Sequence, residues 1–134
     1  MTQNNLAAAY RNRIREDKAE NIEKAIACYD LVLEVRTRAA FPQQWANTQN
    51  NLGEAYRNRI REDKAQNIEK AIACYDLALL VYTRADFPQQ WAMTQNNLAA
   101  AYSERIREDK AENLEKAIAC YELALEVRTR ADFP

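Results

Sequence analysis

Side-chain amides are the most regular chemical feature of this sequence. Pairs of asparagines recur at an interval of 46 residues, and each pair follows a glutamine (Gln3, Gln49, Gln95). An amide both donates and accepts hydrogen bonds, so a row of amides on one surface could pair with the backbone of an extended peptide. Alternatively, the amides could bond to one another or cap local backbone, although helix interiors otherwise disfavour asparagine. The candidates for ligand binding are Asn4, Asn5, Asn50, Asn51, Asn96 and Asn97.

Charged side chains continue the same stretch in each copy. Arg11 and Arg57 follow the asparagines, and the third copy has Ser103 at that position. A guanidinium group could bind a carboxylate or a phosphate, although many such arginines are solvated or pair with a nearby glutamate. We therefore add Arg11, Arg57 and Glu54 to the candidate binding residues.

Residues for catalysis or metal binding do not form a recognisable pattern. The sequence has no histidine, and Cys28, Cys74 and Cys120 stand 46 residues apart without a CxxC pair. Paired carboxylates such as Glu16–Asp17 fall in expected turns, whereas an acid–base site needs one carboxyl group removed from water. We expect no enzyme activity, no metal and no cofactor. The cysteines are expected to be small apolar filler in a reducing, cytoplasmic environment.

Composition excludes two further classes of partner. The formal net charge is −1 over 134 residues, which gives no broad positive field for nucleic acid or for an acidic membrane surface. No apolar run approaches the length of a membrane span, and the first residues lack a signal-peptide pattern. We expect a single domain without nucleic-acid or membrane contacts.

The interval of 46 residues divides the chain into three copies, at residues 2–47, 48–93 and 94–134. Repetition at this period indicates an array of small helical units. In the middle copy, apolar spacing predicts a first helix over about residues 43–61 and a second over about 64–84. Asp63 with Gln66 forms a capping-box pattern between them, and Asp17 repeats it in the first copy. Two helices in each of three copies give an expectation of about six antiparallel helices. The first copy lacks the beginning of its first helix, and we expect no capping helix.

The second helix of each copy is predicted to carry two apolar stripes. One stripe of the middle copy contains Ile68, Ile72 and Tyr75, and another contains Ala73 and Leu77. A helix of this kind is sandwiched between two neighbours. We expect one stripe to contact the first helix of the same copy and the other stripe to contact the next copy.

The small and aromatic residues of the middle copy resemble the tetratricopeptide repeat. The resemblance is carried by the Leu-Gly-x-x-Tyr motif, the later Ala-x3-Tyr-x2-Ala motif, and Pro88. It implies a right-handed α-solenoid of three helix-turn-helix units in which small residues let paired helices approach closely. The repeat of this family is usually 34 residues long, and the tryptophan here precedes the leucine by seven residues rather than three. A HEAT- or armadillo-like array is the second choice. The packing residues implied are Leu52, Gly53, Tyr56, Ala71, Tyr75 and Ala78.

The resemblance also implies a function. Tetratricopeptide arrays present a concave groove, lined by first helices, to a peptide or protein partner, and we expect this chain to be such an interaction scaffold. The family's carboxylate clamp is matched only at Asn51, so binding of a C-terminal chaperone tail is not supported. The chain also has the character of a fragment of a larger array or an engineered repeat protein.

The alternative is a structural unit that associates with itself. The two ends of a repeat array derive from one interface and are complementary, so weak head-to-tail stacking is expected, without a ligand. Three positions of the middle copy differ in type from the others, namely Leu80, Tyr82 and Met93. The sequence does not distinguish a function at these positions from drift.

Overall fold

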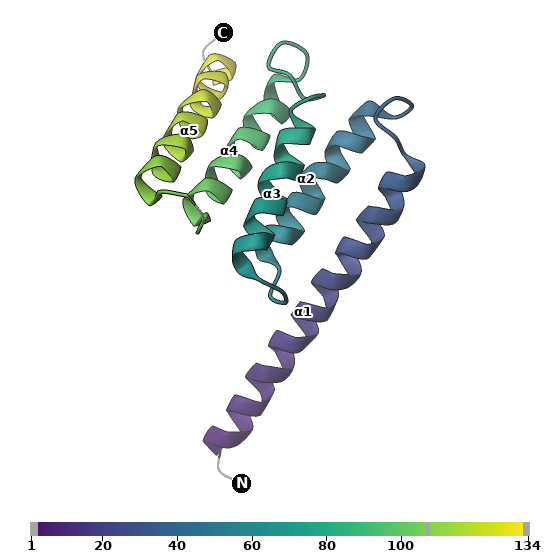
Figure 1. Ribbon diagram of the computed structural model, residues 1–134, viewed down its shortest axis with the longest axis vertical. Coiled ribbons are helices and arrows are strands. Elements are labelled where there is room, and N and C mark those ends of the chain that lie inside the picture. The colour runs from purple at the N-terminus through teal and green to yellow at the C-terminus, as the bar shows by residue number, and fades with distance from the viewer. Residues whose placement is uncertain (1–2, 107, 133–134) are drawn as a thin grey trace.

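The computed structural model is all-helical, and it describes the backbone of residues 3–106 and 108–132 and the side chains of residues 8–10, 12–106 and 108–127. Helices that follow one another in the chain pack side by side, and α2 also contacts α4 (Figure 1). The predicted all-α solenoid fold is therefore confirmed. The described residues form α1 (Gln3–Val35), α2 (Pro42–Asn58), α3 (Lys64–Ala78), α4 (Pro88–Glu104) and α5 (Lys110–Asp132).

The Phe-Pro segments start α2 and α4. Pro42 and Pro88 occupy the first turn of these helices, where the N–H that proline lacks would have no helical partner. Phe41 and Phe87 precede them with non-helical φ of −136°. The chain therefore enters both helices in the same way, because both copies carry the same local sequence.

The turns after α2 and α4 contain a strained residue. Glu62 has φ 67° and Glu108 has φ 69°, a left-handed conformation that favours glycine. Asp63 then caps α3, since its carboxylate accepts a hydrogen bond from the Ala65 amide at 3.3 Å. Asp109 caps α5 in the same way through Ala111, at 2.9 Å. Two tightly packed helices must hold each turn, because the turn itself costs conformational energy.

The first copy does not make this turn, and the expected helix break and cap at Glu16–Asp17 are wrong. Its two expected helices form one continuous helix, α1, of 33 residues. The N-terminal half of α1 runs beyond the ends of the other helices (Figure 1). Residues Tyr10–Ala19 have the same sequence as Tyr56–Ala65, which contain the turn. Neighbouring contacts, not the local sequence, therefore decide between helix and turn.

Helix α3 ends earlier than the sequence predicts, at Ala78 rather than near residue 84. Tyr82 is buried against Ala46 and Ala78, and its ring lies 5.5 Å from that of Phe87 in an edge-on arrangement. Its hydroxyl group donates a hydrogen bond to the Gln43 carbonyl oxygen at 3.2 Å. Tyr82 is therefore part of the core that joins α3 to the start of α2. Leu80 and Met93 are exposed.

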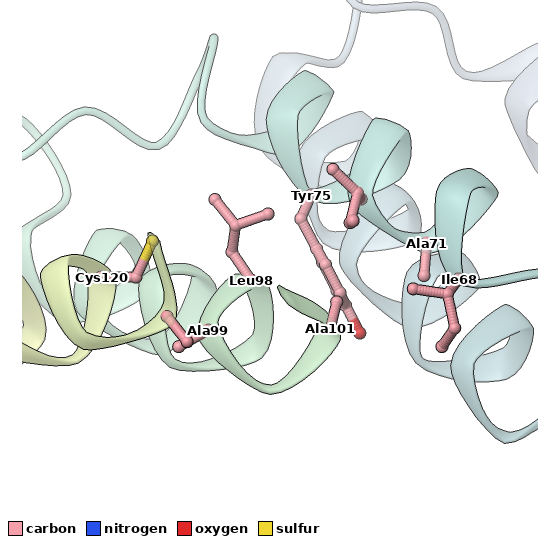
Figure 2. Close-up of a cluster of buried hydrophobic side chains, with 9 residues drawn as sticks. Ile68, Ala71, Tyr75, Leu98, Ala99, Ala101 and Cys120 are labelled. Carbon is pink, nitrogen blue, oxygen red and sulfur yellow. The ribbon is translucent and has the colours of Figure 1, made fainter. Parts of the chain in front are cut away.

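The largest cluster of buried side chains joins α3, α4 and α5. Tyr75 lies between α3 and α4, beside Leu98 and Ala101 (Figure 2). Its ring packs so close to Gly53 of α2 that a Cβ atom at that position would lie 2.6 Å from Cε1. The six packing residues implied by the resemblance are buried, apart from Tyr56, which is half-buried.

The two faces of α3 are not the two stripes expected. Ile68, Ile72 and Tyr75 belong to the cluster shared with α4. Ala73 and Leu77 are exposed, so the second stripe is wrong. The side toward α2 is formed instead by Cys74, Tyr75 and Ala78, which pack against Leu52, Gly53 and Ala46. Within the described residues, no helix is both long and apolar enough to cross a membrane.

Candidate functional site

Polar side chains occupy one side of α2 and of α4. On α2 they recur at helical spacing, and α4 carries its own set at corresponding positions. We call this surface the amide face, although it includes two carboxylates. It consists of Asn47, Asn51, Glu54 and Asn58 on α2, and of Asn97 and Glu104 on α4.

The two asparagines of each pair lie in different environments. Asn50 is buried, and its Nδ2 donates a hydrogen bond to the Thr94 hydroxyl oxygen of α4 at 2.9 Å. Thr94 in turn donates to the Gln90 carbonyl oxygen. Asn50 thus connects two copies, but its partner is a threonine hydroxyl and not a second amide, as the alternative to ligand binding had it. Asn96, the counterpart of Asn50, is exposed because no described helix covers that side of α4.

Asn51 and Asn97 are half-exposed on the amide face. Neither side chain makes a hydrogen bond with the described part of the protein. Glu54, which lies between Asn51 and Asn58 along α2, is exposed. The side chains of Asn4, Asn5 and Arg11 lie outside the described residues, so the first copy adds no described side chain to this face.

Arg57 borders the amide face and is half-buried. Its Nε lies 3.9 Å from a Glu104 carboxylate oxygen, which is too long for a hydrogen bond. This buried Nε has no hydrogen-bond partner within the described residues. Among the described residues, Glu104 therefore holds the Arg57 side chain only through a long ion pair.

The neighbouring arginines connect successive copies. Arg59 donates to both carboxylate oxygens of Glu23 on α1, at 2.8–3.0 Å. Arg105 donates to Glu69 on α3 at 2.7 and 3.0 Å. These hydrogen bonds raise the pKa of both guanidinium groups. Arg105 also lies 3.9 Å from Glu108 in the following turn. The separation of 36 residues is the same within both pairs between copies, and the sequence carries this signal.

The cysteine thiols are not arranged for chemistry. Burial raises the pKa of Cys74 to about 12 and also raises the pKa of Cys120. Cys28 is exposed. Among the described residues, no three His, Cys, Asp or Glu side chains are grouped to hold a metal ion.

A hollow of about 370 Å³ lies between α1 and α2. Its α2 side includes Asn51 and Glu54, so it adjoins the amide face. Its α1 side includes the apolar residues Ile22, Ala25 and Tyr29. The remaining lining residues are Lys18, Asn21, Ala55 and Asn58.

Comparison with protein families matches the tetratricopeptide repeat at residues 1–39 and 91–134, more than half of the chain. The chain belongs to the tetratricopeptide repeat family. Repeats of this family commonly mediate protein–protein interactions and are typically non-enzymatic scaffolds. Searches of curated proteins and of solved structures gave no significant match.

Proposed function

We propose that this tetratricopeptide repeat chain is a protein-interaction module whose amide face binds an extended peptide segment of a partner. The supporting observation is that, within the described residues, the Asn51 and Asn97 side chains make no hydrogen bond, whereas the Asn50 amide donates one to Thr94. An exposed amide can donate to and accept from a peptide backbone, and Arg57 offers a charged donor beside it. The free thiols suit a reducing compartment, so the proposed location is the cytoplasm.

A displayed library of random peptides tests this proposal. Peptides enriched on the chain are measured against the double variant Asn51→Ala with Asn97→Ala. We expect at least about a tenfold loss of affinity, since each lost hydrogen bond is worth about 1 kcal/mol. The free energy of unfolding, measured in urea, should change little in this variant, because both side chains are half-exposed.

The matched control is Leu80→Glu, which changes an exposed residue outside the amide face. Peptide binding should survive this change. Binding that survives the double asparagine variant and disappears in Leu80→Glu would place the partner on the opposite surface and overturn the proposal.

Head-to-tail self-association is the second candidate function, and α5 provides its support. Leu114, Ile118, Tyr121 and Leu125 of α5 are exposed. Their counterparts on α3, such as Ile68 and Ile72, are buried in the cluster shared with α4. The α5 face therefore has the chemistry of a face that α4 covers elsewhere in the same molecule.

Sedimentation from micromolar to millimolar protein tests this stacking. A head-to-tail contact does not have to close into a ring, so the oligomers should become larger as the protein concentration rises. Ile118→Glu should abolish this growth because it places a charge on the contact face. A strict monomer at millimolar concentration would exclude the stacking.

A further inference from the structure

The hollow between α1 and α2 corresponds to a place that is filled in the next copy. Its α1 residues Ile22, Ala25 and Tyr29 are half-exposed. Their counterparts 46 residues later, Ile68, Ala71 and Tyr75, are fully buried by α2 and α4. The hollow therefore has the lining of a helix-binding site with no helix in it.

The remaining residues of this side of α1 show the same contrast. Asn21 and Cys28 are exposed, whereas Asn67 is 1% and Cys74 7% exposed. The third copy agrees with the second, since Asn113 is 2% and Cys120 9% exposed beside α4. In both later copies the covering helix is the one that precedes the turn. In the first copy, that segment is the N-terminal half of α1.

This N-terminal half of α1, residues 3–15, is named the arm. Its Tyr10 is 55% and its Ile14 67% exposed, whereas their counterparts Tyr56 and Ile60 are half-buried. The arm thus carries uncovered apolar side chains of the same type as those that cover the later helices. Because α1 is continuous, the arm points away from the hollow of its own chain (Figure 1).

We propose that the hollow binds the arm of a second copy of the chain, and that two copies exchange arms reciprocally. Filling the hollow with a chain's own arm requires the turn, in which Glu16 would take the left-handed conformation seen at Glu62 and Glu108. Exchange fills the hollow while α1 stays a continuous helix, as it is in this structure. The conformation of α1 thus identifies a second copy as the occupant.

The exchange forms a closed pair. Two α1 helices run antiparallel across a twofold axis near the hinge at Glu16–Lys18, and each arm lies along the hollow of the other chain. Such an isologous contact stops at the dimer, unlike head-to-tail stacking. The lining of the hollow includes Asn51 and Glu54 of the amide face, so an exchanged arm and a bound peptide would compete there. Exchange itself needs no peptide partner, so a failure of peptide binding leaves this proposal standing.

Cross-linking between chains tests the proposal, because Tyr56 packs in one cluster with Cys74. Exchange should place Tyr10 of one chain beside Cys28 of the other in the same way. The variant is Tyr10→Cys in a chain with Cys74→Ala and Cys120→Ala, treated with a short thiol cross-linker. We expect a covalent dimer in which residue 10 of one chain is joined to residue 28 of the other, identified by mass spectrometry. Residue 12 is the counterpart of Asn58, which is exposed. The control variant Asn12→Cys should therefore not cross-link to Cys28.

In the Ile118→Glu variant, which blocks stacking through α5, the chain should sediment as a dimer that does not grow further with concentration. A cross-link between residues 10 and 28 of the same chain would show that the chain's own arm is the occupant and would overturn the proposal. A monomer without a cross-link would also overturn it.

The hinge gives a second, independent readout. Glu16→Ala favours a continuous helix, whereas Glu16→Gly weakens the helix and eases the turn. The dimer should therefore dissociate more readily in Glu16→Gly than in Glu16→Ala, by about 25-fold for two hinges at about fivefold each. Ile118→Glu, which blocks stacking through α5, should leave the dimer intact. Equal dissociation constants for the two Glu16 variants would contradict arm exchange.

Discussion

A single close contact shows how the helices of one copy are paired. Gly53 lies against the ring of Tyr75, and no side chain larger than hydrogen fits there without a shift. Leucine at residue 53 would overpack a filled core. The hydroxyl oxygen of Tyr75 is buried and has no hydrogen-bond partner in the described part of the chain, and burial raises the pKa of Tyr75 to about 12. Packing of the ring thus outweighs the unsatisfied hydroxyl group at this position.

We expect Gly53→Leu to lower the free energy of unfolding by about 1–3 kcal/mol, measured by urea denaturation. Ala99→Gly in the third copy is the control for helix propensity, because alanine already occupies the equivalent position. It should cost only about 0.5–1 kcal/mol. An unchanged urea midpoint for Gly53→Leu would show that the contact with Tyr75 is not close in solution.

The paired Arg59 and Glu23 side chains are only 15% and 22% exposed, so the pair should matter more than a surface ion pair. A double-mutant cycle with Arg59→Ala and Glu23→Ala should give a coupling energy of about 1–3 kcal/mol. The matched control is Lys24 with Glu20, whose side chains are 69% and 56% exposed. Its coupling should be below about 0.5 kcal/mol. Equal coupling in both cycles would contradict a special role for the contact between copies.

At the scale of elements, the segment between paired helices is the most informative. Tyr10–Ala19 and Tyr56–Ala65 have one sequence and two structures. Asn67 supports the turn in the second copy, because its Nδ2 donates to the Arg61 carbonyl oxygen at 3.0 Å. In the first copy Asn21 is exposed. A folded-back arm would have no described helix on its outer side, so less packing would offset the strain of the turn.

Glycine should therefore have opposite effects at equivalent positions. Glu62→Gly relieves a left-handed residue and should raise the free energy of unfolding by about 1 kcal/mol. Glu16→Gly interrupts a helix and should lower it by about 0.5–1 kcal/mol. Urea denaturation of the two variants measures both signs. The same sign for both variants would mean that the two segments share one conformation.

At the scale of the whole molecule, repetition made most of the fold predictable. The period of 46 residues and the small residues around Gly53 were sufficient for an all-helical solenoid and for tight pairing within a copy. Side-chain environment was less predictable, because it depends on which helix covers each face. Asn50 and Asn51 are adjacent and chemically identical, yet one is buried between α2 and α4 and the other is half-exposed.

The early end of α3 and the continuity of α1 were not predictable for a related reason. Tyr82 reads as a change from arginine at a helical position, and only the cluster with Ala46 and Phe87 shows why the helix stops before it. The hinge of α1 contains a good capping residue, Asp17, in a sequence that forms a turn elsewhere. Local signals are identical in the two copies, so a prediction based on local sequence cannot separate them.

Neighbouring helices, not local sequence, decide whether this segment is a helix or a turn. Backbone carbon chemical shifts of Glu16 and Glu62 in the intact chain test it most directly, since both residues lie in the same ten-residue sequence. We predict helical shifts at Glu16 and left-handed shifts, outside the helical range, at Glu62. Matching left-handed shifts at both residues would contradict the claim.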